Sequence, residues 1–66
     1  MNNMAKNLRV IRTRKKLRQV DLAFLSGVSQ SSISQIEGGH KKSPSVWTIT
    51  KLCKALKVSS KELIES

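Results

Sequence analysis

The stretch QVDLAFLSGVSQSSISQIEG, residues 19–38, decides the fold of this chain. Ala23 is a small side chain at a point where two helices can cross closely, and Gly27 follows four residues later. Glycine adopts positive φ without a steric penalty, so Gly27 suits a tight turn. Val28, directly after it, is expected to fill the inner side of that turn. The pattern predicts two helices joined by a tight turn.

The second helix of the pair has a cap and an apolar pair in its sequence. Ser29 is a favourable N-cap residue, and Ile33 and Ile36 follow at i, i+3 spacing, as on the buried face of a helix. We therefore expect helices over residues 19–26 and 30–37. A small residue, a glycine four positions later and an apolar residue six after that satisfy the sterics of a helix-turn-helix. Such motifs place their second helix in the major groove of DNA.

Uncharged polar side chains make up the outward face of this second helix. A glutamine amide can bond bidentately to N6 and N7 of adenine, and a serine hydroxyl is a short, adaptable donor to bases or phosphate. An ordinary solvated helix face is the alternative interpretation. Within a helix-turn-helix, we predict base contacts from four residues: Gln30, Ser31, Ser34 and Gln35.

The positive charge of the chain is concentrated in two flanks. Among 66 residues there are 13 Lys and Arg against 4 Asp and Glu, a net charge of +9. Residues 1–18 carry +7 and residues 38–66 carry +4, whereas residues 19–37 carry −2 and hold no Lys or Arg. Such an excess predicts a polyanionic partner, either nucleic acid or an anionic membrane surface. A merely solvated surface is the third interpretation.

Outside the central stretch, apolar residues recur at helical spacing in further segments. Helices are predicted over residues 3–15, from Ser45 onward and after Ser59, where Ser59 and Glu62 form a capping-box pattern. The first of these shows ordinary core amphipathicity rather than the face of a membrane-binding helix. The fold class is therefore all-α, one compact five-helix domain spanning residues 1–66. The expected inward positions are Met4, Leu8, Ile11, Leu22, Ala23, Leu25, Ile33, Ile36, Val46, Ile49, Leu52, Cys53, Leu56, Leu63 and Ile64.

Composition excludes several classes of protein. Cys53 is the one cysteine, so neither an internal disulfide nor a multi-cysteine metal site can form. His40 is the one histidine and the acidic residues form no convergent pair, so we predict no enzyme, no metal and no cofactor. No apolar run approaches the ~20 residues of a membrane span, and the N-terminus lacks the apolar stretch of a signal peptide. The expected location is the cytoplasm, and the nucleoid when bound to DNA.

Three segments resemble one family of regulators. They are LRVIR at 8–12, QVDLAFLSGVSQSSISQIE at 19–37 and PSVWTITKLCKALKVSSKEL at 44–63. Here the chain is similar to the Xre family, the lambda-repressor/Cro-like helix-turn-helix domains of phage and bacterial regulators. The resemblance implies a lambda-repressor-like fold and sequence-specific binding of double-stranded DNA. It also implies a transcriptional regulator, first of all a repressor, that binds an inverted-repeat operator as a homodimer.

The resemblance further implies roles for individual residues. The residue at the Gln19 position opens the first helix of the motif and holds a backbone phosphate with its side chain and the helix N-terminal amides. In such domains Arg12 and Glu37 form a salt bridge that ties the first helix to the end of the third, and Arg12 facing phosphate is a compatible second role. Base edges are met by residues matching Gln30, Ser31 and Gln35. The expected phosphate contacts are Gln19, Arg12, Ser29, Ser32, Lys41 and Lys42.

Two positions depart from the family pattern. Lys16 stands where the family has a glycine, so the glycine C-cap expected at the end of the first helix is weakened. The loop over residues 37–44 is one residue longer than is common, which leaves the phosphate contacts of His40, Lys41 and Lys42 open.

Four residues outside the motif are candidates for other roles. Phe24 is expected to lie flat over the edge of the small core, and Trp47 to contact a dimer partner or another protein. Cys53 is expected to be a buried, inert thiol rather than a redox switch. His40 is interpreted as a plain loop residue, with pH sensing and phosphate binding as the alternatives.

Two further functions stay open beside a repressor. One is an antitoxin that neutralises a toxin and binds DNA only for autoregulation. The other is a restriction-modification controller, which activates as well as represses. No small-molecule effector is expected within so short a chain. Co-purification of a tight partner would favour the antitoxin, and the neighbouring genes would distinguish the controller.

Overall fold

Helices make up all the regular structure in the described part of the chain. The computed structural model describes residues 4–40 and 44–65. The helices run in the order α1 (Met4–Arg14), α2 (Gln19–Ser26), α3 (Gln30–Glu37), α4 (Val46–Leu56) and α5 (Ser60–Glu65). The all-α class and the five helices predicted from the sequence are confirmed, with closely similar boundaries.

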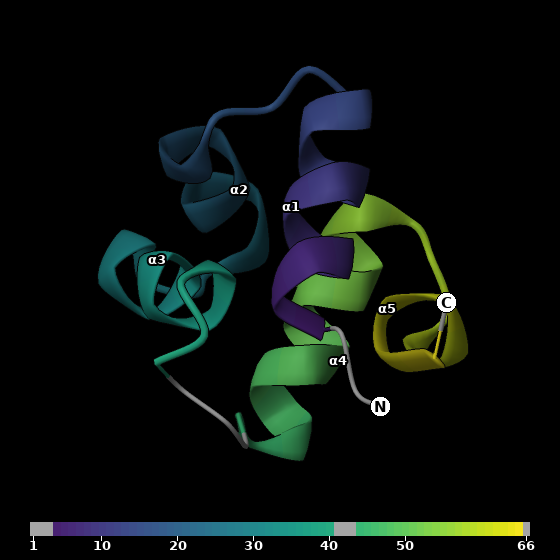
Figure 1. Cartoon of the computed structure of the whole chain (residues 1–66). Coiled ribbons are helices and arrows are strands. Elements are labelled where there is room, and N and C mark those ends of the chain that lie inside the picture. The colour runs from purple at the N-terminus through teal and green to yellow at the C-terminus, as the bar shows by residue number, and fades with distance from the viewer. Residues whose placement is uncertain (1–3, 41–43, 66) are drawn as a thin grey trace.

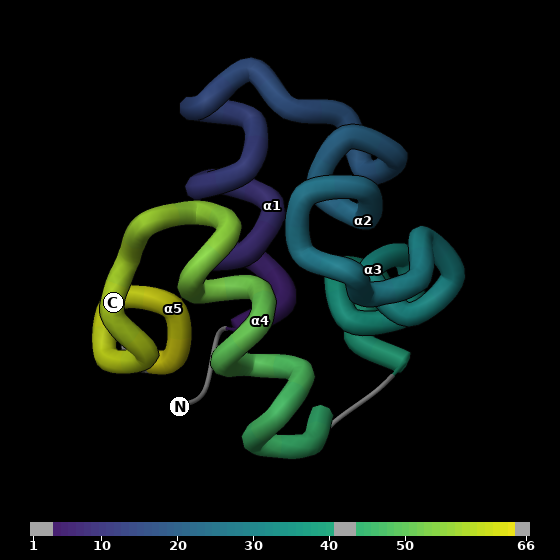
Figure 2. Tube along the Cα trace, turned by 180° about the vertical axis from the view of Figure 1, so that it is seen from behind, coloured from purple at the N-terminus to yellow at the C-terminus, as the bar shows by residue number. Residues whose placement is uncertain are grey.

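The helices surround one apolar core. In Figure 1, α1 stands in front of α4. The pair α2 and α3 lies on one side of them and α5 on the other. Figure 2 shows the molecule from behind, with α4 in front of α1. α1 packs against α3 and α5, and α2 packs against α3 and α4. The pair formed by α2 and α3 is thus anchored on the two longer helices. The largest fully buried side chains come from every helix: Leu8, Leu22, Ile33, Ile36, Leu52, Leu56 and Leu63.

Serine residues cap three helices, as their sequence positions predict. The Ser29 side-chain oxygen accepts a hydrogen bond from the Ser32 N–H at 3.1 Å, and that of Ser45 accepts one from the Thr48 N–H at 3.2 Å. Before α5, the Ser59 side chain accepts from the N–H of the third residue after it at 3.1 Å. Each bond satisfies one of the N–H groups that a helix start leaves without an intrahelical partner.

Lysine takes the place of glycine where two helices end. Lys16 has φ +61° and Lys57 has φ +58°, the left-handed region that glycine favours. The Leu17 N–H bonds to the Arg12 carbonyl at 3.1 Å and the Lys16 N–H to the Thr13 carbonyl at 2.9 Å, which are the two bonds of a Schellman motif. Lys57 ends α4 in the same way. The expectation that the end of α1 differs because Lys16 replaces a glycine is corrected, since α1 ends in the glycine-type geometry. The weaker cap stays a prediction, because an L-residue is disfavoured at this φ.

Three apolar residues expected at the core are exposed instead. Phe24 was predicted to lie flat over the core edge, and this is wrong because 89% of its surface is exposed. Leu25 on the same helix is also exposed, since Leu22 fills the inner face of α2. Val46 is exposed because it is the first residue of α4, directly after the cap, and precedes the part of α4 that reaches the core at Leu52.

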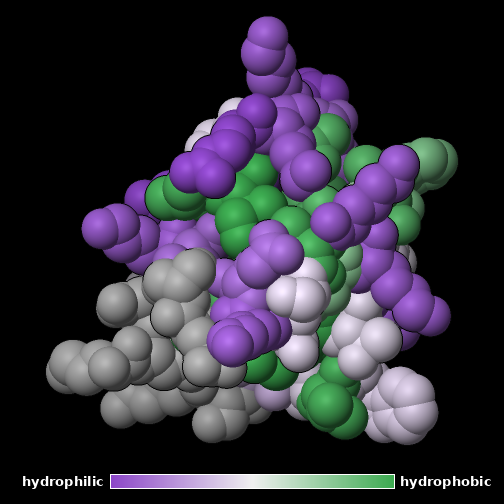
Figure 3. Space-filling view, turned by 90° about the vertical axis from the view of Figure 1, so that its right-hand side faces the viewer, coloured by the Kyte–Doolittle hydropathy of each residue, from purple (hydrophilic) through white to green (hydrophobic). Residues whose placement is uncertain are grey.

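The surface on the α5 side is mostly hydrophilic. Figure 3 looks at this side and shows purple hydrophilic side chains around a smaller green apolar area. On α4 and α5 the exposed charges include Lys51, Lys54 and Lys61. Within residues 4–40 and 44–65, no helix combines the length and the apolar character that a membrane crossing requires.

Candidate nucleic-acid interface

The turn between α2 and α3 is tight because a glycine and a valine meet its two requirements. Gly27 has φ +79°, and its N–H bonds to the Ala23 carbonyl at 2.9 Å. A side chain at Gly27 would be strained at this φ. Val28 is buried, and its N–H bonds to the Ser26 side chain at 3.1 Å. The positive φ at Gly27 and the burial of Val28 are confirmed as predicted.

α3 turns an uncharged polar face to the outside. Its residues Ile33, Ile36 and Glu37 are buried. α3 carries neither lysine nor arginine, so it presents amides and hydroxyls to its surroundings. The predicted base-contacting residues are all exposed, and we call these four the recognition surface: Gln30, Ser31, Ser34 and Gln35.

A buried ion pair fixes the C-terminal end of α3 to α1. Glu37 is the last residue of α3, and only 1% of its side chain is exposed. Arg12 donates from Nε to Glu37 Oε2 at 2.6 Å and from Nη2 to Glu37 Oε1 at 2.8 Å. It also donates from Nη1 to the Leu17 carbonyl at 2.7 Å. The structure thus brings together the pair that the family resemblance implied, in a bidentate geometry that sets direction as well as distance.

Two more side chains reach the same carboxylate. Gln19, the first residue of α2, donates from Nε2 to Glu37 Oε1 at 3.1 Å, and the Arg9 guanidinium lies 3.7 Å from that oxygen. Burial raises the pKa of Glu37, but the hydrogen bonds from Arg12 and Gln19 and the positive charges of Arg12 and Arg9 together outweigh burial, so the pKa lies below its ordinary value. Glu37 therefore joins α1, α2 and α3 at one point.

An acidic residue, Asp21, lies in the first turn of α2 and pairs with Arg18. Asp21 Oδ2 accepts from the Arg18 N–H at 2.8 Å, and the Arg18 guanidinium bonds to both Asp21 oxygens at 3.0 Å. The bond from the Arg18 side chain, followed by the one from its backbone, lowers the pKa of Asp21. A carboxylate therefore occupies the positive end of the helix dipole, where the sequence led us to expect a phosphate.

The described side chains assigned to phosphate have partners within the chain. Gln19 and Arg12 are bonded to the carboxylate at the end of α3, and Ser29 and Ser32 are bonded to each other through their hydroxyls at 2.9 Å. Only 11% of the Arg12 side chain is exposed, which argues against a direct phosphate contact by its guanidinium. The phosphate assignments stay predictions.

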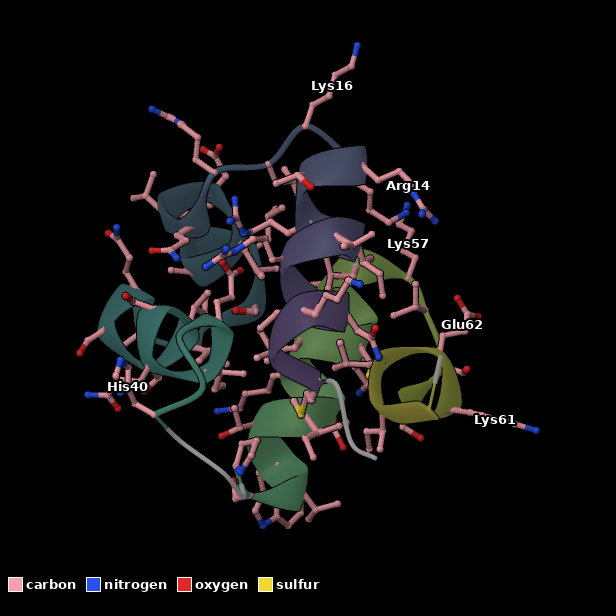
Figure 4. All side chains as sticks on the ribbon, in the orientation of Figure 1. Arg14, Lys16, His40, Lys57, Lys61 and Glu62 are labelled. Carbon is pink, nitrogen blue, oxygen red and sulfur yellow. The ribbon has the colours of Figure 1, made fainter. Side chains whose placement is uncertain are left out.

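Part of the positive charge lies away from α3. The predicted phosphate contacts of Lys41 and Lys42 fall outside the described residues. α3 itself holds no Lys or Arg, so the cations of the described residues lie on other parts of the chain. In Figure 4, four labelled cations project from parts of the molecule other than α3: Arg14, Lys16, Lys57 and Lys61.

Sequence reasoning missed Arg9 and the bond between Arg18 and Asp21. An acidic residue at the third position of a helix is the signal of a capping box, and Asp21 carries this signal. Nothing in the local sequence marks Arg9, because its approach to Glu37 depends on the packing of α1 against α3.

Other residues with suspected roles lie outside the recognition surface. Cys53 is buried, as predicted, and burial together with the negative charge of Glu62 raises the pKa of its thiol. His40 is exposed three residues after the end of α3 (Figure 4). Trp47 is 75% exposed on α4, so its contact with a partner stays a prediction. In the described ranges, no cluster of His, Cys, Asp and Glu could hold a metal ion.

A tight glycine turn, two packed short helices and an exposed polar face on the second of them define a helix-turn-helix domain. The model of the helix-turn-helix family matches residues 8–63, and the chain belongs to this family. The resemblance to lambda-repressor/Cro-like domains that the sequence shows is thereby confirmed.

Two curated proteins of Bacillus subtilis (strain 168) are similar over most of the chain. The HTH-type transcriptional repressor RghR is 43% identical over 58 residues, which are 88% of this chain and 43% of that protein. The uncharacterized HTH-type transcriptional regulator RghRB is 39% identical over 64 residues, 97% of this chain and 46% of that protein. The chain spans less than half the length of either relative.

Two solved structures share the fold. The restriction-modification controller protein C.AhdI from Aeromonas hydrophila gives a TM-score of 0.86 at 40% identity, covering 91% of this chain and 89% of that chain. The P22 c2 repressor protein, solved in complex with synthetic operator 9T in the presence of Tl+, gives 0.85 at 34% identity, covering 94% and 92%. The lambda-repressor-like fold expected from the sequence is confirmed.

Proposed function

We propose that this chain is a sequence-specific DNA-binding transcriptional regulator that acts as a repressor. The observation that carries the proposal is the recognition surface, a set of uncharged polar side chains exposed on a helix whose end is held by a buried ion pair. Two similar proteins support it. RghR is named a transcriptional repressor, and the P22 c2 repressor was solved in complex with an operator. We infer that α3 enters the major groove, as the second helix of such motifs does.

In this proposal the recognition surface makes the base contacts. Gln30 is the first residue of α3, and the N-terminal residues of a recognition helix lie nearest the base edges. The amides of Gln30 and Gln35 suit adenine N6 and N7, and the serine hydroxyls serve bases or phosphates. α3 has no guanidinium for the bidentate pairing with guanine O6 and N7. We therefore expect adenine opposite Gln30 in each half-site.

Phosphate contacts would supply affinity and register. The Gln19 Nε2 carries two N–H groups, and its bond to Glu37 uses one of them, so the other is available to a phosphate oxygen. Arg12 makes no direct bond to the phosphate in this proposal, and its positive charge attracts the phosphate that Gln19 binds. The remaining assignments in the proposal are Ser29, Ser32, Lys41 and Lys42.

We further propose that the chain binds an inverted repeat as a homodimer. A two-fold protein matches a palindromic site whose half-sites lie about 34 Å apart. Trp47 and Val46, both exposed at the start of α4, form the candidate dimer contact. Exposed aromatic residues are frequent anchors of interfaces, which favours Trp47 as the centre of the contact.

Selection from a random DNA pool tests the proposal. The chain is used to enrich duplexes at moderate salt, and the same selection is run in parallel with the double variant Gln30→Ala/Gln35→Ala. A symmetric consensus that the wild-type chain enriches and the double variant loses would support it. Binding without any consensus, falling steeply with salt, would leave only non-specific electrostatic attachment and refute the proposal.

A restriction-modification controller is the second candidate function. It is favoured by the superposition on C.AhdI, at a TM-score of 0.86 and 40% identity. A reporter gene distinguishes the two, because a controller raises transcription from a site placed upstream of the promoter, whereas a repressor acts only from an overlapping site. The absence of enzymatic activity and the cytoplasmic location stay predictions from the sequence.

A further inference from the structure

Helix α2 carries apolar side chains on its outer side as well as on the side that faces the core. Leu22 fills the inner face of α2 and is fully buried. On the outer side Val20, Phe24 and Leu25 are exposed, Phe24 to 89%. A helix that is apolar all round is normally buried all round. In the described part of a single copy, the outer side of α2 is therefore an uncovered apolar surface.

A shallow groove lies beside the exposed phenylalanine. Its volume is about 470 Å³, and most of its lining side chains are apolar. We call this surface the α2 groove, lined by Leu17, Arg18, Val20, Asp21, Phe24 and Leu25. An exposed ring and a hollow of the size to receive a ring thus lie on one face of the same helix.

We propose that the α2 groove docks onto the α2 groove of a second copy of this chain. A two-fold contact requires a patch that is complementary to itself, so that each copy offers what the other receives. The α2 groove meets this requirement, because Phe24 is exposed next to a hollow lined by Leu17 and Val20. In the pair, each Phe24 ring enters the hollow of the other copy.

The charges on the rim of the groove also fit a second copy. Arg18 and Asp21 are its charged members, and they bond to each other at 3.0 Å within the chain. Their charges cancel, so the groove offers no net charge to a strongly acidic or basic partner. Around a two-fold axis the Arg18 of each copy can meet the Asp21 of the other, which places opposite charges together.

The size of the groove makes the pairing weak. A stable interface buries about 800 Å² on each partner, and the few side chains of the α2 groove offer much less. Weak contacts become effective when the copies are held close together, because the local concentration is then high. Coupling between copies on neighbouring DNA sites would follow, and this consequence rests on the proposed function. The self-association itself does not.

Amide NMR spectra of the chain over a series of protein concentrations test the proposal. The resonances of residues 19–26 are expected to shift as the concentration rises. Mixtures of labelled and unlabelled chain should show contacts between the Phe24 ring and Leu17 or Val20 of the other copy. Phe24→Ser should weaken the self-association about tenfold or more, as removal of an aromatic anchor does. Because the ring is 89% exposed, the melting temperature should stay unchanged.

Trp47→Ser is the matched control, because it removes an exposed aromatic ring from α4. It should leave the concentration-dependent shifts of α2 in place, whatever it does to the separate dimer contact proposed for DNA binding. Val20→Thr keeps the shape of the side chain and replaces one methyl group with a hydroxyl, so it should weaken the pairing, and with Val20 45% exposed it should have little effect on the fold. The proposal would be overturned if the α2 resonances did not change with concentration, or if Phe24→Ser and wild type showed equal concentration-dependent shifts. The α2 groove would then be a candidate binding site for a different protein.

Discussion

Arg12 and Glu37 join α1 to the end of α3 through two hydrogen bonds, Nε to Oε2 at 2.6 Å and Nη2 to Oε1 at 2.8 Å. Both side chains are largely removed from water. The same guanidinium bonds to the Leu17 carbonyl, so Arg12 also holds the segment that leads from α1 to α2. This ion pair therefore helps to fix the orientation of the recognition surface, together with the buried Ile33 and Ile36 of α3.

Removing the acid from this pair should destabilise the fold strongly. Glu37→Ala leaves the Arg12 charge buried without its main partner, and loss of one member of a buried pair costs about 3–5 kcal/mol. A domain of this length has a total stability of about 3–10 kcal/mol. The variant should therefore lose between about a third and all of its stability. Urea unfolding followed by circular dichroism measures the free energy of unfolding.

Arg9→Ala is the control for this prediction. Arg9 lies 3.7 Å from the same carboxylate, but 61% of its side chain is exposed. Exposed ion pairs contribute about 0–1 kcal/mol, so the loss should be small. The double variant Arg12→Met/Glu37→Leu removes both charges and should regain much of the stability. Equal losses for Glu37→Ala and Arg9→Ala would contradict the assignment of Arg12 as the main partner.

The same carboxylate should make stability depend on pH. Burial raises the pKa of Glu37, but the hydrogen bonds from Arg12 and Gln19 and the charges of Arg12 and Arg9 together outweigh burial, so the pKa is lowered in the folded chain. A group with a lowered folded pKa stabilises the fold above its unfolded pKa, and this contribution is lost as the pH falls through the folded pKa. The free energy of unfolding should therefore decline as the pH drops below about 4.3. Urea titrations at a series of pH values measure the decline.

Glu37→Gln removes the titrating group and keeps the shape of the side chain. The variant should be less stable at neutral pH and should lose less stability on acidification. Asp21, whose pKa the Arg18 side chain lowers, titrates in the same direction, so Asp21→Asn is measured beside it. If wild type and Glu37→Gln declined equally between neutral and acid pH, Glu37 would not be the source of the dependence.

Glycine at the end of α4 should stabilise the chain. Lys57 has φ +58°, and its N–H and that of Val58 close the helix end on the carbonyls of Lys54 and Cys53. The left-handed conformation costs an L-residue about 1–2 kcal/mol, which glycine avoids at the expense of backbone entropy. Lys57→Gly should therefore gain about 0.5–1 kcal/mol. In a domain of this size each kcal/mol raises the melting temperature by about 4–8 °C, which a thermal melt detects.

Lys54→Gly is the matched control for the helix end. Lys54 lies inside α4 and is exposed, so the substitution removes the same side chain without relieving any positive φ. Glycine inside a helix costs about 1 kcal/mol, so this variant should melt at a lower temperature. A lower melting temperature for both variants would show that the φ of Lys57 is not a source of strain.

The fold was predictable where a residue type has one common structural use. Gly27 predicts a positive φ, Val28 a plug for the turn, and Ser29 a helix cap, and each is observed. The left-handed backbones of Lys16 and Lys57 were not predictable from residue type, because lysine carries no signal for that conformation, and only the family pattern marked position 16 as the place of a glycine. The hydrogen bonds of the two helix ends impose it, and these bonds depend on how the next segment packs.

The candidate site was predictable in part. Ile33 and Ile36 set the inner face of α3, so its outer face followed directly. α2 is short and apolar on both sides, so periodicity could not tell which side meets the core, and Phe24 was placed wrongly. The bond from Gln19 to Glu37 joins residues 18 positions apart and depends on tertiary packing alone.

Gln30→Ala and Lys42→Ala should weaken DNA binding in different ways. If Gln30 contacts a base, its loss should cost about 1–3 kcal/mol on the selected duplex and relax the preference at one base pair. If Lys42 contacts phosphate, its loss should weaken all duplexes alike and reduce the slope of log Kd against log salt by about 1. Kd is measured on the selected duplex and on duplexes changed at single base pairs, at several salt concentrations.

The comparison separates the two kinds of contact because partial unfolding would weaken all duplexes alike, but would change neither the preference at one base pair nor the salt slope. Gln30 is exposed on α3, and alanine is the stronger helix former, so Gln30→Ala should keep the fold. A Gln30→Ala chain that bound every duplex more weakly and kept its full preference would reassign Gln30 to phosphate. A Lys42→Ala chain that lost its preference at one base pair would reassign Lys42 to the bases. Either result would move sequence selection away from the uncharged face of α3.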